Sequence, residues 1–251
     1  MNSSSPMDRP SLPPPDPAIV VPVLDEAEAL PSLLAELSEL DLLAHTVFVD
    51  NGSRDGSAAL IRAAGGTVIE EPRRGYGYAC LAGSAEVSHR SSEIVVFMEG
   101  DGSDDPAEIG RLVAPVAAGR FDLMIGSRRT AVRRGAHMPA HQRFGEWLTV
   151  ALMRLLFGLR LSDNGPFRAI RVDLLEHLGM EPRGFSWPTE MAVKAHLCGA
   201  RIGFCETGFR RRRGDSKISG TARGTWAAAV GIFGALLRLR LRAHPAPYRP
   251  Q

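Results

Sequence analysis

The sequence predicts one α/β domain with a mainly parallel sheet and helices on both faces. Three observations support this fold class. Short β-branched runs alternate with leucine-periodic segments along the first half, the connections between them are short, and 44% of the 251 residues are hydrophobic. A chain of this length can bury one full core but not two large ones. Ligands of such folds bind beyond the carboxyl ends of the strands.

Five short apolar runs are expected to form strands, and β-branched residues dominate the first two. These runs span residues 18–22, 46–50, 67–70, 93–98 and 121–125. The segment 28–43 predicts a helix, because its leucines recur at helical spacing. Further helices are expected after Gly52, with Asp55 as the cap, after Gly75, and from Pro106 onward.

The two ends of the chain differ in composition from its centre. Residues 1–17 are rich in Ser and Pro and contain no apolar segment of the kind that a signal peptide needs. They predict a disordered leader that precedes one folded domain at 18–223. An apolar helix followed by arginines is expected at 224–242, and a tail at 243–251.

The cysteines bear on the cellular compartment. Cys80, Cys198 and Cys205 lie far apart in the sequence, with neither a CxxC pair nor a histidine at zinc-binding spacing. Neither a disulfide framework nor a zinc site is indicated. A reducing cytoplasm therefore fits this cysteine usage best.

Charge is distributed unevenly along the chain, although the net charge is only +2. Residues 1–127 carry 8 Lys or Arg and 20 Asp or Glu, giving −12, whereas residues 128–251 carry 22 and 8, giving +14. Such asymmetry favours contact between the second half and an anion, such as a phosphorylated substrate, a nucleic acid or an anionic membrane. The alternative is that oppositely charged surfaces attract each other within one fold.

Acidic side chains follow the 93–98 run directly, in the motif Glu99-Gly-Asp-Gly-Ser-Asp-Asp. Alternating carboxylates at a strand end suit an oxygen-ligated divalent cation, which in turn can hold a diphosphate. The alternative is an ordinary turn in which Asp104, Asp105 and Pro106 start the next helix. The neighbouring motifs favour the cation site.

Seven motifs in order resemble those of the family 2 glycosyltransferases, which have the nucleotide-sugar-binding GT-A fold with its Rossmann-like sheet. The similarity is to the branch of the dolichyl- and polyprenyl-phosphate mannose and glucose synthases, and it runs from about Ile19 to Arg242. The motifs begin at Val20, Val49, Arg74, Glu99, Gly126, Asp163 and Arg213, the second being Val-Asp-Asn-Gly-Ser-Arg-Asp-Gly-Ser. Each motif alone is weak, but together they are specific. The resemblance implies a GT-A catalytic domain at 18–223 with acceptor-side helices toward the C-terminus.

The resemblance implies a site for a UDP- or GDP-linked sugar at the strand ends. Asp50 offers a carboxylate to the N–H edge of a base, and Glu26 can accept from ribose hydroxyls. Gly75 lets the backbone approach the nucleotide closely, although a lone Gly-x-Gly is weak evidence. The nucleotide-binding residues are expected to be Pro22, Leu24, Glu26, Asp50, Gly52, Ser53, Gly75 and Gly100.

The same resemblance assigns a Mg²⁺ or Mn²⁺ site to Glu99, Asp101 and Ser103, with Asp101 as its central residue. Glu99 departs from the family pattern, which has aspartate there, and is one methylene longer. A carboxylate remains available, and these ions keep several waters and need few protein ligands. A bound cation would neutralise the charge that develops on the leaving nucleoside diphosphate.

The resemblance assigns basic residues of the second half to an acceptor phosphate. Guanidinium groups bind phosphate oxygens in pairs, which suits them to this task. Arg128 is also expected beside the diphosphate, and the alternative for the run at 210–213 is a solvated surface. The acceptor-side residues are expected to be Arg128, Arg129, Arg133, Arg134, Asp163, Arg213, Ser216 and Lys217.

The expected reaction is inverting transfer of a hexose, in which the acceptor oxygen attacks the anomeric carbon opposite the diphosphate. A polyprenyl phosphate is the favoured acceptor and needs no strong base, because its oxygen is already anionic. A hydroxyl acceptor needs one, and Glu190 is the candidate. Glu190 and Asp163 could instead cap a helix or pair with arginine. The expected catalytic residues are Asp101, Glu190 and Arg128.

An apolar, uncharged segment at 224–237 precedes Arg238, Arg240 and Arg242. It is shorter than the roughly 20 residues that span a bilayer, so it can lie on a membrane surface but not cross it. The alternative is a helix packed on the domain or in a dimer interface, and the apolar 145–158 segment presents the same choice. We expect a cytoplasmic protein, peripheral to the inner face of the membrane where its acceptor is lipid-linked.

Two other classes of function are compatible with the sequence. A nucleotidyltransferase uses a similar sheet and metal, but is expected to carry a glycine-rich first loop with a basic residue, which 23–26 lacks. A non-catalytic protein that binds a nucleotide-sugar or another anion would use the same pocket without the metal. Nucleic acid is the least favoured partner, because the basic half lacks interleaved aromatic residues. The motifs leave the donor base, the sugar, the acceptor and the oligomeric state open.

Overall fold

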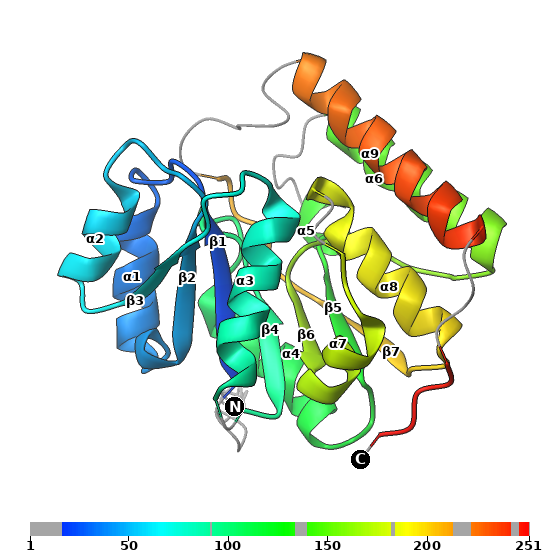
Figure 1. The fold of residues 1–251 in the computed structure, drawn as a ribbon, viewed down its shortest axis with the longest axis horizontal. Coiled ribbons are helices and arrows are strands. Elements are labelled where there is room, and N and C mark those ends of the chain that lie inside the picture. Colours follow the sequence, from blue (N-terminus) through cyan, green and yellow to red (C-terminus); the bar gives the residue numbers. More distant parts are fainter. Residues whose placement is uncertain are drawn as a thin grey trace, which may run out of the picture.

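The computed structural model contains a seven-stranded sheet with helices packed on both of its faces (Figure 1). It describes residues 17–90, 92–133, 140–181, 184–212, 222–241 and 246–250. The strand order is β3-β2-β1-β4-β6-β5-β7. The strands are β1 (Ala18–Val23), β2 (Thr46–Asp50), β3 (Thr67–Glu70), β4 (Ile94–Phe97), β5 (Leu123–Ser127), β6 (Arg168–Arg171) and β7 (Ile202–Glu206).

All neighbouring strands run parallel except β6, which is antiparallel to both β4 and β5. The mainly parallel sheet and the five strands expected from the sequence are confirmed. β6 and β7 are additional. The pattern does not reveal β6, because only Ala169 and Ile170 of its four residues are apolar, with an arginine on each side. The parallel strands β1, β2 and β4 end at the same edge of the sheet, which positions their following loops together.

The helices alternate with the strands as predicted, with small changes in their bounds. The expected helix at 28–43 is shorter, because it ends at Glu39 and is followed by a separate 3₁₀ turn. The α-helices are α1 (Leu30–Glu39), α2 (Ser57–Ala63), α3 (Tyr76–Ser88), α4 (Ile109–Ala117), α5 (Arg129–Arg133), α6 (Ala140–Phe157), α7 (Val172–Leu178), α8 (Trp187–Leu197) and α9 (Ala222–Leu241). The 3₁₀ turns are η1 (Leu43–His45), η2 (Pro106–Glu108) and η3 (Gly184–Ser186).

Two helix starts test the predicted caps. The helix expected from Pro106 opens as η2, and the Asp105 carboxylate accepts a hydrogen bond from the N–H of Ala107 at 3.0 Å. Asp55 is not the cap residue of α2, because Gly56 occupies that position with φ near +90°. The Asp55 carboxylate accepts instead from the N–H of Ser57 and, across the loop, from the N–H of Ala27. It therefore ties the start of α2 to the end of β1.

Alternate residues of β1 face opposite sides of the sheet, as the two-residue period of a strand requires. Val20 belongs to the core that α3, α7 and α8 cover, whereas Ile19 and Val21 belong to the core that α1 and α4 cover. These three side chains are fully buried. Burial on both faces explains why the central strands are continuous apolar runs and do not alternate with polar residues.

The C-terminal helix α9 packs along α6 and α8 at one end of the molecule (Figure 1). It contributes Leu236 to the core, and α6 contributes Met153. The helix expected at 224–242 therefore corresponds to α9, packed on the domain by one side. Within the described parts of the chain, no helix combines the length and the apolar character needed to cross a membrane.

Gly83 allows α3 to pack closely on β1, because a Cβ at this position would collide with a methyl group of Val20. We predict that Gly83→Ala lowers the free energy of unfolding by about 1–3 kcal/mol, the usual cost of overpacking a core. Gly145 of α6 faces open space, so Gly145→Ala is expected to raise it by about 0.5–1 kcal/mol. Denaturant titration of both variants measures the difference. Equal effects at the two positions would contradict this account of the α3–β1 contact.

Candidate active site

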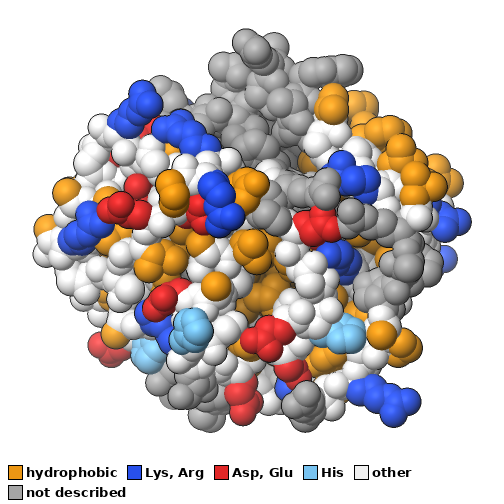
Figure 2. Space-filling view, viewed as in Figure 1, with side chains coloured by type: hydrophobic (Ala, Val, Ile, Leu, Met, Phe, Trp, Pro, Cys, Tyr) orange, Lys and Arg blue, Asp and Glu red, His pale blue; other side chains and the backbone are white. Residues whose placement is uncertain are grey.

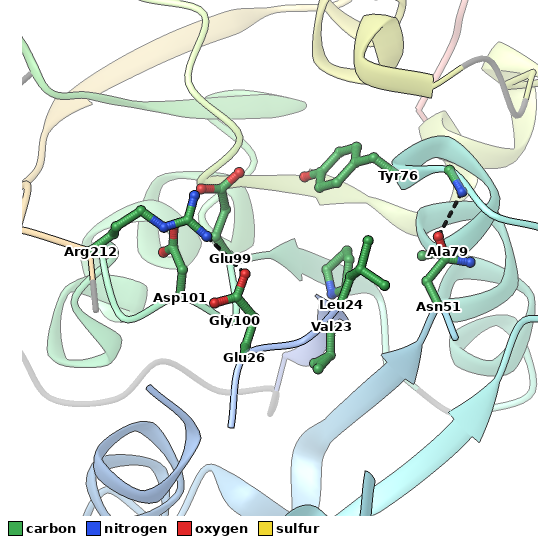
Figure 3. Close-up of a pocket in the computed structure, with 12 residues that line it drawn as sticks. Val23, Leu24, Glu26, Asn51, Tyr76, Ala79, Glu99, Gly100, Asp101 and Arg212 are labelled. Atoms are coloured by element: carbon green, nitrogen blue, oxygen red, sulfur yellow. Dashed lines mark hydrogen bonds and ion pairs between the residues drawn. The ribbon is translucent and has the colours of Figure 1, made fainter. Parts of the chain in front are cut away.

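A cavity of about 180 Å³ opens at the carboxyl edge of the sheet, where β1 and β4 end and α3 begins (Figure 3). We call it the strand-end cavity. Five of the eight residues predicted to bind a nucleotide line it, at the edge of the sheet where the sequence led us to expect a ligand. Its lining residues are Pro22, Val23, Leu24, Glu26, Asn51, Gly75, Tyr76, Ala79, Glu99, Gly100, Asp101 and Arg212.

One wall of this cavity is acidic and carries a single arginine. The guanidinium group of Arg212 is 2.8 Å from a carboxylate oxygen of Glu26 and 3.4 Å from one of Asp101. Figure 3 shows Glu99 beside them, while Tyr76 and Asn51 lie across the cavity. The arginine thus joins the loop after β1 to the loop after β4.

The carboxylates of this wall repel one another. Burial and the nearby charges of Asp101 and Asp104 raise the pKa of Glu99 well above its usual value, although Arg128 and Arg212 oppose the shift. Burial also raises the pKa of Asp104 to about 7. Burial and the neighbouring carboxylates therefore both disfavour the ionised form of Glu99, and a divalent cation bound at this wall would favour it.

Two of the three predicted metal ligands line the cavity, and the third lies behind it. Glu99 and Asp101 line the cavity, whereas Ser103 is buried outside its lining, and its N–H donates to the Asp101 carboxylate at 2.9 Å. Ser103 thus holds Asp101 in place through its backbone. Among the described residues, no three His, Cys, Asp or Glu side chains form a ready-made metal cage. Two carboxylates still fit Mg²⁺ or Mn²⁺, because such ions complete their shells with water and phosphate oxygens.

Gly100 separates the two acidic ligands and permits the close approach of two strand ends. A Cβ at this position would lie 3.1 Å from the carbonyl oxygen of Pro22, tighter than ordinary van der Waals contact. The absence of a side chain therefore lets the loop after β4 lie against the end of β1. This contact brings Glu99 and Asp101 to the same cavity as Glu26.

Asn51 organises the opposite wall. Its amide nitrogen donates to the carbonyl oxygens of Glu71 and Arg73, each at 2.9 Å, and its amide oxygen accepts from the N–H of Gly75 at 2.7 Å. One side chain therefore fixes the loop that leads from β3 into α3. Because Gly75 and Tyr76 line the cavity, Asn51 sets the shape of that wall.

The remaining predicted nucleotide residues lie behind the lining. Asp50 is 8% exposed, and one of its carboxylate oxygens has no hydrogen-bond partner. The hydroxyl of Ser53 accepts from the N–H of Asp25 at 3.0 Å, and the carbonyl of Gly52 accepts from Arg74 at 2.8 Å. These residues support the loops around the cavity, and the lining position at the end of β2 belongs to Asn51.

A second cavity of about 360 Å³ lies between α5, α6 and the loop before β6. We call it the arginine cavity. It brings together Arg128, Arg129 and Asp163, three of the residues that the sequence assigned to the acceptor side. Its lining residues are Arg128, Arg129, Val132, Arg143, Glu146, Trp147, Val150, Ser162 and Asp163.

Arg128 connects the two cavities electrostatically. Its guanidinium group binds Asp163 through two nitrogens, at 2.7 and 3.1 Å, and Glu146 at 3.2 Å. The backbone N–H of Arg128 also donates to Asp163 at 2.7 Å. The charge of Arg128 in turn opposes the raised pKa of Glu99 in the strand-end cavity. Arg128 therefore lies close enough to influence both sites.

The pKa values of the two carboxylates that bind Arg128 are shifted in opposite directions. Arg128 holds the pKa of Asp163 well below its usual range, against the effect of burial. Burial raises the pKa of Glu146 to about 7, even though Arg128 opposes the shift, because Asp163 repels a second charge. Asp163 therefore remains ionised, and Glu146 takes up a proton near neutral pH.

Several predicted residues do not line either cavity. Glu190 of α8 is buried, and its carboxylate binds the Lys194 ammonium at 2.7 Å and accepts from the N–H of Glu181 at 3.0 Å. It is thus engaged in holding α8, which matches the structural alternative for this residue. Arg133 closes α5, and its side chain is outside the description. Residues that lie outside the described ranges altogether are Arg134, Arg213, Ser216 and Lys217.

Several residues that line the cavities are not among the site residues expected from the sequence, including Asn51, Tyr76, Glu146 and Arg212. Asn51 and Arg212 each sit next to a residue that is, namely Asp50 and Arg213. The motif that begins at Val49 contains Asn51, and the arginine run at 210–213 contains Arg212, so the sequence does indicate both neighbourhoods. It could not show that Asn51, and not its neighbour Asp50, turns toward the cavity. Glu146 gave no signal, because it lies within an apolar helix.

The mostly parallel sheet, with helices on both faces and a cavity at its carboxyl edge, is the GT-A fold that the sequence predicted. The sequence model of Glycosyl transferase family 2 matches residues 18–179. The chain therefore belongs to glycosyl transferase family 2 and is an enzyme of sugar transfer. The resemblance noted from the seven motifs is confirmed.

Relatives in sequence agree with this assignment. An uncharacterized glycosyltransferase of Mycobacterium tuberculosis is 34% identical over 216 residues, which cover 86% of this chain and 95% of the relative. The undecaprenyl-phosphate mannosyltransferase of Micrococcus luteus is 30% identical over 230 residues, covering 87% and 94%. The polyprenol monophosphomannose synthase of Mycolicibacterium smegmatis is 28% identical, covering 81% of each chain.

Solved structures share the fold. Glucosyl-3-phosphoglycerate synthase from Mycobacterium tuberculosis in complex with UDP superposes with a TM-score of 0.70 at 21% identity, covering 90% of this chain and 80% of that one. The same enzyme in complex with Mn²⁺, UDP and phosphoglyceric acid gives a TM-score of 0.68 at 23% identity, covering 89% and 78%. At this level of identity the likeness concerns the fold.

The titration of Glu146 predicts a pH dependence of stability. Its folded pKa of about 7 lies above the ordinary 4.5, so the protonated form stabilises the fold. This contribution is full below pH 4.5 and is lost as the pH rises through 7. Between these values, the unfolding free energy of the wild type should fall by about 1–3 kcal/mol more than that of Glu146→Gln. Denaturant titrations at both pH values, with Glu39→Gln as the surface control, measure this. If the unfolding free energies of the wild type and of Glu146→Gln change in parallel with pH, Glu146 does not have the raised pKa given above.

Proposed function

We propose that this protein transfers a hexose, with inversion at the anomeric carbon, from a UDP- or GDP-linked sugar to a polyprenyl phosphate. The reaction depends on Mg²⁺ or Mn²⁺. One observation carries the proposal: an acidic cavity at the carboxyl edge of the sheet adjoins an arginine-lined cavity, with Arg128 acting on both. A donor diphosphate and an anionic acceptor need these two environments side by side.

The strand-end cavity supplies the donor site in this proposal. Glu26 offers an acceptor for ribose hydroxyls, and the ordered loop at Gly75 lets backbone approach the nucleotide. Glu99 and Asp101 are the residues that hold the cation, with Ser103 fixing Asp101. When bound, the cation supplies positive charge to the departing diphosphate. Arg212, already paired with Glu26 and Asp101, adds a cationic group at the same place.

The arginine cavity supplies the acceptor site. Arg128, Arg129 and Arg143 all line it, so a phosphate entering there meets several guanidinium groups. A phosphate oxygen is already anionic at neutral pH and attacks without a general base.

The sequence relatives support the acceptor class. The proteins from Micrococcus luteus and Mycolicibacterium smegmatis carry names that specify an undecaprenyl-phosphate mannosyltransferase and a polyprenol monophosphomannose synthase. Both align over most of this chain. We propose mannose or glucose as the hexose and a peripheral position on the cytoplasmic face of a membrane, where a lipid phosphate is presented.

Incubation of the purified protein with labelled UDP- or GDP-hexose, Mn²⁺ and a polyprenyl phosphate tests the proposal. Label is expected in the organic phase, and chelation of the cation should abolish its transfer. Asp101→Asn should lower kcat/KM by about 100-fold or more, because it removes a carboxylate that would hold the cation on which stabilisation of the leaving group depends. Asp41→Asn makes the same chemical change at an exposed position with φ of +57°, which asparagine tolerates, and serves as the control. A product confined to the aqueous phase would overturn the acceptor, and undiminished transfer by Asp101→Asn would overturn the cation site.

Asn51 provides a separate test of the donor wall. Asn51→Ala removes three hydrogen bonds to the loop at 71–75 and leaves buried backbone groups without partners. We expect nucleoside diphosphate binding to weaken about tenfold and the free energy of unfolding to fall by about 1–3 kcal/mol. Isothermal titration with UDP and GDP measures the first effect, and denaturant titration measures the second. If a folded Asn51→Ala variant binds UDP and GDP as tightly as the wild type does, the wall that Asn51 organises is not part of the donor site.

A further inference from the structure

Large apolar side chains exposed to solvent are concentrated on two neighbouring helices. Of the nine such residues in the described part of the chain, eight belong to α6 and α9, and only Leu60 lies elsewhere. Figure 2 shows apolar side chains along the edge of the molecule where Figure 1 places α9. The eight residues are Phe144, Trp147, Leu148 and Leu155 of α6, and Val230, Phe233, Leu237 and Leu241 of α9.

These residues form one stripe on each helix. In α9 they follow a spacing of three, four and four residues, which keeps them on one side of an α-helix. In α6 they also span eleven residues, from Phe144 to Leu155. Each stripe is therefore about 16 Å long at 1.5 Å rise per residue. Because α6 and α9 pack against each other, we take the two stripes together as one surface, which we call the α6–α9 face.

The degree of exposure is too high for side chains that merely border a core. Leu155 and Leu241 are each 78% exposed, Trp147 62% and Phe233 55%. The inner sides of the same helices are well packed, since Met153 and Leu236 are fully buried. Each helix is therefore apolar on two sides, one of which contacts the domain. A second apolar side on a surface helix indicates that something else covers it.

The charges around this face favour an anionic partner. α9 contains no acidic residue, and its last turns carry Arg238 and Arg240. The only acidic residue of α6 is Glu146, which is turned to Arg128 and to the N–H of Asn164. Two copies of such a face would bring like charges together, whereas anionic lipid headgroups complement them.

The α6–α9 face is continuous with the arginine cavity. Trp147 belongs to both, since it is exposed on the face and also lines the cavity. Arg143, which lines the cavity as well, precedes Phe144 in the chain. A lipid whose chain lies along the face can therefore place its phosphate among the arginines. A tryptophan at this boundary is typical of side chains at the interface of a membrane with water.

We propose that the α6–α9 face lies flat on an anionic bilayer, with its two apolar stripes buried at the level where headgroups meet acyl chains. Arg143, Arg238 and Arg240 then face the lipid phosphates, and the mouth of the arginine cavity opens onto the membrane surface. The use of this surface to collect the acceptor rests on the proposed function. The docking itself does not, because it depends only on the apolar stripes and their charges.

Flotation of the full chain with lipid vesicles tests the proposal. We expect binding to vesicles of phosphatidylcholine with phosphatidylglycerol, weaker binding to phosphatidylcholine alone, and release as salt is raised. The triple variant Leu155→Ser, Phe233→Ser, Leu241→Ser should lower the partition coefficient at least tenfold. These three side chains are exposed and line neither cavity, so the fold and the donor site should be retained. Leu60→Ser, which changes the exposed leucine off the face, should bind as the wild type does.

Two further measurements separate this proposal from its alternatives. The triple variant should keep its activity on a short, water-soluble prenyl phosphate and lose it on a long prenyl phosphate embedded in vesicles. Vesicle binding without any sugar transfer by the wild type would refute the proposed function and leave the docking intact. Failure of the wild type to bind vesicles, or equal binding by the triple variant, would refute the docking. Light scattering that shows a wild-type dimer and a monomeric triple variant would instead identify the face as an interface between copies.

Discussion

Repulsion among carboxylates at the carboxyl edge of the sheet is the constraint on which the rest of this structure depends. The parallel strands bring Glu26, Glu99 and Asp101 to one cavity, and Gly100 lets their loops meet. Such a cluster is tolerated only where positive charge accompanies it. Arg212 pairs with Glu26 and Asp101, while burial, together with the charges of Asp101 and Asp104, raises the pKa of Glu99 despite Arg128 and Arg212. In the proposed function, a divalent cation bound together with the donor diphosphate would supply further positive charge at this site.

Arginines from the second half of the chain offset acids of the first half at several points. Arg212 binds Glu26, Arg210 binds Glu36 and Asp105, and Arg201 binds Asp122. The uneven charge of the sequence is therefore explained in part by attraction within the fold, which was one of the two alternatives. Around the arginine cavity the pattern changes, because Arg128 is paired with Asp163 and Glu146 of its own half. That cavity and the α6–α9 face are where the basic half is left to meet an external anion.

The sequence predicted the sheet because its central strands are buried on both faces and so consist of continuous apolar runs. It missed β6, where arginines at both ends break the run, and Arg168 is nevertheless buried, with its guanidinium bound to backbone carbonyls. It located the acidic edge but chose Asp50 where Asn51 lines the cavity, since which of two adjacent residues turns inward depends on the loop that follows. Glu190 could be nominated from its residue type, and only its ion pair with Lys194 and the hydrogen bond from the N–H of Glu181 show how its carboxylate is engaged.

The central claim, that the strand-end cavity holds a divalent cation together with a nucleoside diphosphate, is tested most directly by electron paramagnetic resonance of Mn²⁺. Free Mn²⁺ gives a sharp signal that disappears when the ion is immobilised on a protein. With UDP or GDP present, the account predicts that one Mn²⁺ per chain is lost from the free signal beyond what the nucleotide alone removes, and that Glu99→Gln and Asp101→Asn restore it. Retention of the full free signal with the wild-type protein and both nucleotides, or equal Mn²⁺ binding by the two variants, would contradict the account.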